Sequence, residues 1–132
     1  MLDLDHFKRF NDTFGHDAGD SLLRELGQLL RERLRQSDIL CRYGGEEFVL
    51  ILPDSSLADT QQRVEQIRGL IKGLKIRHGD ELVGTIAVSA GIAGTPEHGS
   101  TAAELLRAAD SALYAAKQAG RDCVVVYHAK PS

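Results

Sequence analysis

The clearest hydrophobic pattern in the chain is a pair of strand-like segments. An alternating run over residues 39–43 leads into Gly44-Gly45, and a continuous apolar run over 48–52 leads out. Because glycine adopts the positive φ values of tight turns, this pattern predicts a β-hairpin. Glu46 and Glu47 begin the second strand, where two neighbouring acids repel each other and add nothing to folding. They indicate either an ordinary solvated hairpin or a metal–phosphate site, since glycines let a ligand approach the backbone.

Helical patterns flank this hairpin. A short helix is expected over 6–14, with Asp5 as its cap and Gly15 at its end. Leucines at helical spacing predict a second helix from Asp17 to about residue 34. Two further helices are expected after the capping boxes that begin at Ser56 and Thr101.

Strand patterns complete the order of elements. Besides the hairpin, strands are expected over residues 1–5, 75–78, 82–93 and 123–127. The resulting order is β-α-α-β-β-α-β-β-α-β. It predicts an α/β fold in which helices cover a mixed central β-sheet.

Composition narrows the class of protein. With 132 residues the chain is expected to form one domain, and 42% hydrophobic with 27% charged residues is typical of a globular protein. No apolar run approaches the roughly 20 residues of a membrane span, and no signal peptide precedes the fold, so a cytoplasmic location is expected. The net charge of −3 argues against a nucleic-acid polymer as partner. Cys41 and Cys123 are expected to be buried thiols in strands.

Two groups of polar residues lie outside the hairpin. In an extended segment Asp3 and Asp5 share one face, and Asp3 lies where a strand ends, a frequent place for ligand sites in α/β folds. Tyr114, Lys117 and Arg121 share one face of the last helix. The two cations either compensate the helix dipole or bind a phosphate.

Several motifs together resemble the GGDEF family of diguanylate cyclases. The hairpin reads Gly44-Gly45-Glu46-Glu47-Phe48, the GGEEF form of the family signature. The segments 3–8 and 11–20 match the D-x-D-x-F-K and N-D-x-x-G-H-x-x-G-D motifs, and 88–93 is similar to the V-S-x-G-I-A strand. Residues 114–121 match the family's Y-x-A-K-x-x-G-R ending. The match runs from the first residue nearly to the last.

The resemblance implies a reaction and a fold. Family members have a nucleotidyl-cyclase or palm-like, ferredoxin-like fold and join two GTP molecules into cyclic di-GMP with release of pyrophosphate. Nucleotidyl transfer depends on in-line positioning and on neutralised charge, which metal ions supply. Mg²⁺, or alternatively Mn²⁺, is the implied cofactor. A homodimer is expected, because each GTP must meet a second one.

The resemblance also assigns residues. It implies Asp3, Leu4 and Glu46 as metal-binding residues, and Asp3, Glu46 and Glu47 as catalytic residues. Asn11 and Asp20 match the guanine-reading positions, and a carboxylate accepts well from the N–H groups of guanine. The remaining substrate-binding positions serve phosphate or leave room for the nucleotide: His6, Phe7, Lys8, Gly44, Gly45, Lys117 and Arg121.

A fourth motif lies upstream of the hairpin. Arg35-Gln36-Ser37-Asp38 fits the family's R-x-x-D inhibitory site, which binds the product cyclic di-GMP. An arginine fork suits phosphate or a guanine edge, although a solvated helix end gives the same pattern. A second arginine often completes such a site, and the sequence leaves Arg63 and Arg68 as candidates.

The chain also departs from the family pattern. The family's N-terminal helix and the start of its first strand are missing from residues 1–132, so weak or absent turnover is expected, and a regulatory domain is expected in the full-length protein. A non-catalytic cyclic di-GMP-binding module is therefore the alternative function, and an α/β interaction domain is a third. Asp122 stands where the family usually has asparagine, and little effect is expected from this difference.

Overall fold

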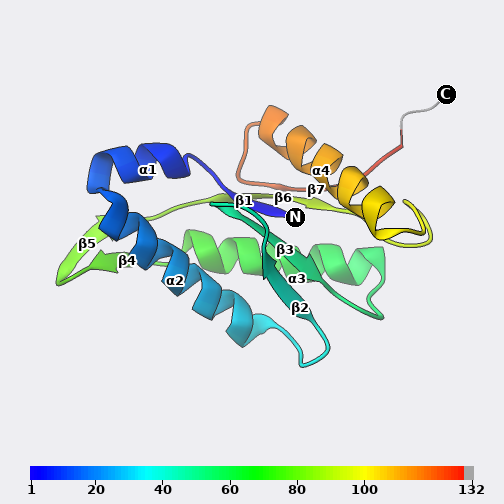
Figure 1. Cartoon of the computed structure of the whole chain (residues 1–132), viewed down its shortest axis with the longest axis horizontal. Helices are drawn as coiled ribbons and strands as arrows, with labels where there is room; N and C mark the ends of the chain where they lie inside the picture. Colours follow the sequence, from blue (N-terminus) through cyan, green and yellow to red (C-terminus); the bar gives the residue numbers. More distant parts are fainter. Residues whose placement is uncertain (130–132) are drawn as a thin grey trace.

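The computed structural model describes residues 1–129, except the side chains of His78, Glu81 and Val83. It contains a five-stranded sheet, a separate two-stranded sheet and helices on both faces of the larger sheet (Figure 1). The helices are α1 (Phe7–Phe14), α2 (His16–Arg33), α3 (Leu57–Lys72) and α4 (Ala102–Gln118). The strands are β1 (Leu2–Leu4), β2 (Ile39–Arg42), β3 (Glu47–Ile51), β4 (Ile76–His78), β5 (Glu81–Gly84), β6 (Val88–Ile92) and β7 (Val124–Val126).

The larger sheet has the strand order β2-β3-β1-β6-β7. Strand β1 lies at its centre and pairs antiparallel with β3 and β6, whereas β6 and β7 are parallel. The expected mixed α/β sheet is thus confirmed. In Figure 1, α4 lies above β6 and β7, and α3 lies below them, so the sheet is covered on both sides.

The alternation of side chains along the strands separates the hydrophobic core from the polar face. Leu2 and Leu4 of β1 join the core with the leucines of α2 and the apolar residues of α3. Asp3 lies between them in sequence and therefore points to the other face, toward α4. One strand thus supplies both the core and a buried acid.

Local signals predicted several boundaries correctly. The side chain of Ser56 accepts a hydrogen bond from the N–H of Asp59 at 3.1 Å, and α3 follows it. Thr101 accepts from the N–H of Glu104 at 3.2 Å in the same way before α4. Gly79 and Asp80 form the turn that joins β4 to β5.

Other sequence predictions are wrong. The single strand expected over 82–93 is two strands, because β5 pairs with β4 in the small sheet while β6 joins the large one. Asp5 does not cap α1: the N-cap is His6, in the left-handed region with φ 58°, and it makes no capping hydrogen bond through its side chain. The carboxylate of Asp5 instead accepts from Ser89 and from the N–H of Asp122.

The hairpin and the cysteines also differ from expectation. Gly44 and Gly45 do not have positive φ, and the loop between β2 and β3 spans Tyr43–Glu46. Cys41 is exposed on β2 rather than buried. Cys123 is half-buried just before β7, and burial raises the pKa of its thiol.

Gly91 provides a test of how closely the sheet packs against α4. A Cβ atom at this position would lie 2.3 Å from the carbonyl oxygen of Ala109 and 2.3 Å from the backbone nitrogen of Leu113. Backbone atoms cannot move aside easily, so we expect Gly91→Ala to lower the free energy of unfolding by about 3 kcal/mol. Urea denaturation followed by circular dichroism measures this change.

Gly69 is the matched control. It lies in α3, and a Cβ atom there would meet nothing within 4 Å. Since alanine is the better helix former, Gly69→Ala should raise the free energy of unfolding by about 0.5–1 kcal/mol. Equal effects of the two substitutions would contradict the close packing of β6 on α4.

Candidate functional site

Three acidic residues lie where β1 and β3 run side by side. Asp3 is opposite Glu47 in the antiparallel register, and the carbonyl oxygen of Glu46 accepts from the N–H of Leu4 at 3.3 Å. Asp3 is 4% exposed, and both glutamates are half-buried. The structure thus brings together the catalytic residues expected from the sequence.

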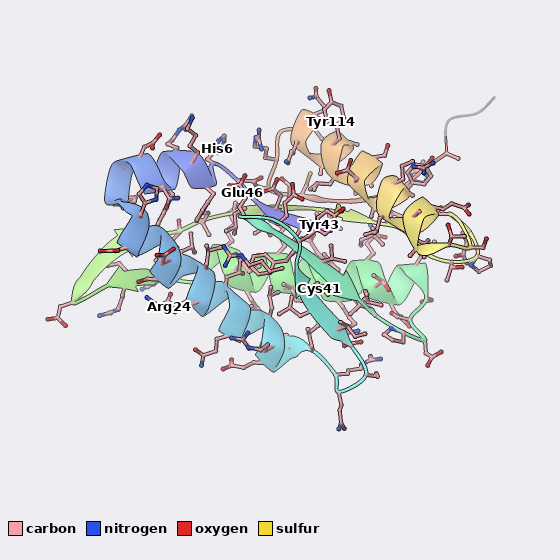
Figure 2. All side chains as sticks on the ribbon, viewed as in Figure 1. His6, Arg24, Cys41, Tyr43, Glu46 and Tyr114 are labelled. Carbon is pink, nitrogen blue, oxygen red and sulfur yellow. The ribbon has the colours of Figure 1, made fainter. Side chains whose placement is uncertain are left out.

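Cations of α4 and the following turn face these acids. The ammonium group of Lys117 forms an ion pair with Asp3, and the guanidinium of Arg121 lies 3.8 Å from Asp5. Tyr114 is exposed on the same helix. In the view of Figure 2, Glu46 lies between His6 at the start of α1 and Tyr114 of α4. Lys117 therefore does more than compensate a helix dipole, because it neutralises a buried acid.

The electrostatic environment of Glu46 disfavours its charged form. Burial raises the pKa of this carboxyl, and the neighbouring charge of Asp3 raises it further, while Lys117 and Arg121 act in the opposite direction. The cations present do not fully offset the desolvation and the repulsion. A carboxylate in this position favours an additional cation nearby.

The donor set fits a hard divalent cation. The Oδ1 atom of Asp3 is buried and has no hydrogen-bond partner among the described residues. Glu46 adds a second carboxylate, and Leu4 follows Asp3 in the same strand and has a backbone carbonyl. Within residues 1–129 no group of three or more His, Cys, Asp and Glu side chains could hold a metal ion. Two carboxylates suit Mg²⁺, which keeps several waters and phosphate oxygens as ligands.

The expected guanine-reading residues lie where α1 and α2 meet. The side chain of Asn11 lies directly over Gly19, because a Cβ atom on Gly19 would be 1.8 Å from the Oδ1 of Asn11. This Oδ1 is buried and has no partner among the described residues. Asp20, the next residue along α2, is exposed and lines a groove of about 470 Å³. A buried amide oxygen without a partner among the described residues and an exposed carboxylate thus belong to the same junction of α1 and α2.

Three arginines that the sequence did not mark as site residues also line this groove. Arg24 and Arg31, which no motif singles out, line the groove together with Arg42. Their spacing from Asp20, four and eleven residues along one helix, was the available signal. Arg42 also donates to the carbonyl oxygen of Gly45 at 2.7 Å and so fixes the loop of the hairpin. A Cβ atom on Gly45 would meet nothing within 4 Å, which leaves open space beside the loop.

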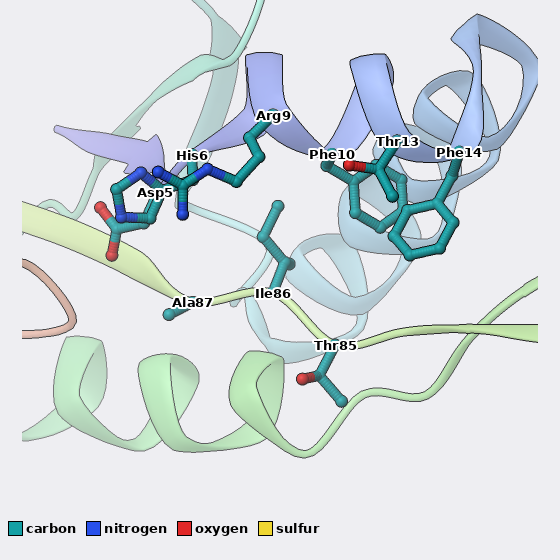
Figure 3. A pocket seen from close by; sticks show the side chains of 9 residues that line it. All are labelled: Asp5, His6, Arg9, Phe10, Thr13, Phe14, Thr85, Ile86 and Ala87. Carbon is teal, nitrogen blue, oxygen red and sulfur yellow. The ribbon is translucent and has the colours of Figure 1, made fainter.

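A second cavity of about 260 Å³ lies beneath α1. Figure 3 shows Phe10 and Phe14 at one end of it, Asp5 and His6 at the other, and Ile86 between them. His6, Phe7 and Lys8, the expected phosphate contacts, lie at the start of α1. His6 and Lys8 are exposed and Phe7 is half-buried, so the backbone of this segment is the part best placed for an anion.

The R-x-x-D motif forms a compact cluster after α2. The carboxylate of Asp38 accepts from the N–H of Arg35 at 2.7 Å and from the guanidinium of Arg63 at 2.7 Å. The Asp38 side chain is 1% exposed, and the hydrogen bond from Arg63 is the main reason why its pKa lies below the usual value. Arg68 lies elsewhere, bound to Glu65 and Asp122. Of the two arginines that the sequence leaves open, only Arg63 contacts Asp38.

The part of the chain that the structure describes contains no helix long and apolar enough to cross a membrane.

Comparison with known proteins identifies the family. The family model described as diguanylate cyclase, GGDEF domain, matches residues 1–123. The response regulator PleD of Caulobacter vibrioides is 45% identical over 127 residues, which are 95% of this chain and 28% of PleD. The chain therefore spans less than a third of that relative.

Solved structures agree in fold. The GGDEF domain of PA1120 from Pseudomonas aeruginosa matches with a TM-score of 0.91 and 38% identity, over 98% of this chain and 80% of that one. The GGDEF domain of DgcB from Caulobacter crescentus, solved in complex with c-di-GMP, has a TM-score of 0.85 and 37% identity, over 95% and 74% of the two chains. The chain belongs to the GGDEF family of diguanylate cyclase domains.

Proposed function

We propose that this domain condenses two GTP molecules into cyclic di-GMP and releases two pyrophosphates. The observation that carries the proposal is that Asp3 of the central strand pairs with Lys117 of α4 and lies close to Glu46, directly before the neighbouring strand β3. An unpartnered buried carboxylate oxygen, a second acid with a raised pKa and a nearby cation suit a metal–triphosphate group. Membership of the family supports the same reaction.

The metal would be held by Asp3, Leu4 and Glu46, with Glu47 close by. When bound, Mg²⁺ (or Mn²⁺) would neutralise phosphate charge as the 3′-hydroxyl of one GTP attacks the α-phosphate of the other. Lys117 and Arg121 would contact the phosphates. Lys117 is bound to one oxygen of Asp3 in the structure, and its ammonium group has three donors, so it can contact phosphate while it keeps this ion pair.

The guanine base would be read at the junction of α1 and α2. Asn11 offers an unpartnered amide oxygen and Asp20 an exposed carboxylate, which together suit the N–H groups of a guanine edge. His6, Phe7 and Lys8 would contact the terminal phosphates, and Gly44 and Gly45 would leave room for the nucleotide beside the hairpin. Each domain binds one GTP, so the active species would be a homodimer.

The cluster of Arg35, Asp38 and Arg63 would bind the product and inhibit the enzyme. Two of its buried atoms, Asp38 Oδ1 and Arg63 Nη1, have no partner among the described residues. A ligand with guanine edges and phosphates can satisfy both. The chain covers less than a third of PleD, so a regulatory domain in the full-length protein also belongs to the proposal. A cytoplasmic location is proposed as well.

Turnover is the first test. The purified chain, stripped of bound product, is incubated with GTP and Mg²⁺, and cyclic di-GMP is measured by chromatography. We expect product from the wild-type chain and at least about 100-fold less from Glu46→Ala. Loss of a residue that only hydrogen-bonds to a metal ligand commonly lowers activity by 10–100-fold, and loss of a ligand itself should cost at least as much. The control is Glu97→Gln, which removes one acid from an exposed loop and should leave turnover unchanged. Cyclic di-GMP binding without turnover would favour the non-catalytic binding module instead.

The raised pKa of Glu46 predicts a pH-dependent stability in metal-free buffer. The folded pKa lies above the unfolded value of 4.5, so the folded state binds the proton more tightly, and stability falls as pH rises through the folded pKa. Because glutamine does not titrate, Glu46→Gln should not show this fall in stability with rising pH. We therefore expect the variant to be more stable than the wild-type chain at pH 7 and equally stable below the unfolded pKa.

Urea denaturation with a chelator present, repeated across pH, measures this difference. Glu97→Gln should show no such pH dependence relative to the wild-type chain, because the exposed Glu97 lies outside the site. A constant stability difference between Glu46→Gln and wild type at every pH would contradict the electrostatic origin.

Arg63 and Arg68 form a matched pair for the inhibitory site. They lie five residues apart on α3, but only Arg63 contacts Asp38. We expect Arg35→Ala and Arg63→Ala to weaken cyclic di-GMP binding by roughly 10–100-fold, the value of a charge-assisted hydrogen bond. Arg68→Ala should leave this affinity near wild type. Titration calorimetry measures it, and a larger loss for Arg68→Ala would overturn the assignment of Arg63.

A further inference from the structure

Arg121 sits in an unusual turn between α4 and β7. Gly120, Arg121 and Asp122 have successive positive φ values of 113°, 67° and 49°. Two consecutive non-glycine residues in the left-handed region are uncommon, and such a backbone persists only when its surroundings determine it. The direction of the Arg121 side chain therefore depends on what anchors this turn.

The inner anchor is Asp5, which is 5% exposed. Its Oδ2 accepts from the backbone N–H of Asp122 at 2.9 Å, and its Oδ1 accepts from the hydroxyl of the fully buried Ser89 at 2.6 Å. The guanidinium of Arg121 lies 3.8 Å from the same carboxylate. Asp5, directly after the central strand, thus binds the backbone of the turn and lies close to the positive charge of Arg121.

The outer anchor is the side chain of Asp122. Its Oδ1 accepts from Arg68 at 2.6 Å and its Oδ2 accepts from Lys72 at 2.5 Å, and both donors lie on α3. An asparagine at this position has one side-chain oxygen and cannot accept from both cations on separate oxygens. The second carboxylate oxygen of Asp122 therefore adds an attachment between the turn and α3, so this position matters more than the sequence suggested.

We propose that Asp5 and Asp122 are positioning residues that hold Arg121 toward the triphosphate of the nucleotide. Asp5 fixes the turn from inside the sheet, and Asp122 fixes it from α3. Neither needs to touch the substrate, because each acts through the backbone of the turn. This inference rests on the proposed function, in which Arg121 contacts phosphate.

The test compares a triphosphate with a monophosphate. The probes are 3′-deoxy-GTP, which lacks the attacking hydroxyl, and GMP, both measured by calorimetry with Mg²⁺. We expect Arg121→Ala, Asp5→Asn and Asp122→Asn each to weaken 3′-deoxy-GTP binding by about 10-fold, the size of one modest charged contact, and to leave GMP binding within about 2-fold. Asp80→Asn removes the same charge in the β4–β5 turn and should change neither affinity.

A double-mutant cycle separates positioning from general damage. In the Arg121→Ala background, Asp5→Asn and Asp122→Asn should have no further effect on the triphosphate, because their effect passes through Arg121. An unchanged 10-fold loss in that background, or an equal loss for GMP, would overturn the inference. Should Asp5→Asn fail to fold, Asp122→Asn carries the same expectation.

The inference and the proposed function fail in different ways. If Arg121→Ala weakens triphosphate binding and the two aspartate variants do not, the positioning role is wrong and the phosphate site stands. If the wild-type chain binds 3′-deoxy-GTP but makes no cyclic di-GMP from GTP, the cyclase activity is wrong and the cycle still decides the positioning role. If Arg121→Ala binds 3′-deoxy-GTP as tightly as the wild-type chain does, the positioning role is wrong, and the turnover test still decides the cyclase activity. If the wild-type chain does not bind 3′-deoxy-GTP, both are wrong.

Discussion

The arrangement of the site depends on two carboxylates that the central strand carries into the interior. Asp3 and Asp5 are 4% and 5% exposed, and burying a charge is costly unless partners compensate it. Lys117 compensates Asp3, while Ser89 and the N–H of Asp122 bind Asp5. Because Lys117 lies in the last turn of α4 and Asp122 in the turn that follows, the acids of β1 determine where the end of α4 meets the sheet.

The same strand explains why fold and site are specified together. Leu2 and Leu4 alternate with Asp3, so a slip of one residue in the pairing of β1 would place the acid in the core and the leucines in the site. The observed register is the one that satisfies the core and the carboxylate at once. It also places Glu47 opposite Asp3, where their charges need a cation.

Interactions between residues close in sequence were enough to predict where helices begin. Contacts between residues far apart in sequence decided which strands pair and what Asp5 binds. The capping boxes at Ser56 and Thr101 depend on neighbours three residues away, so they were readable from the sequence. The segment 82–93 was not, because β propensity does not reveal that β5 and β6 join different sheets. Asp5 has the preference of a helix cap, but its partners Ser89 and Asp122 lie far away in sequence.

The partner of Asp38, Arg63 rather than Arg68, is likewise decided by a contact between residues far apart in sequence. Both lie on α3, and only the path of the 35–38 loop decides that Asp38 meets Arg63. The resulting ion pair is incomplete, because Asp38 Oδ1 and Arg63 Nη1 remain buried without partners among the described residues. A buried polar cluster with unmade hydrogen bonds is costly to the protein alone. A small ligand rich in donors and acceptors removes that cost, whereas an apolar partner surface would increase it.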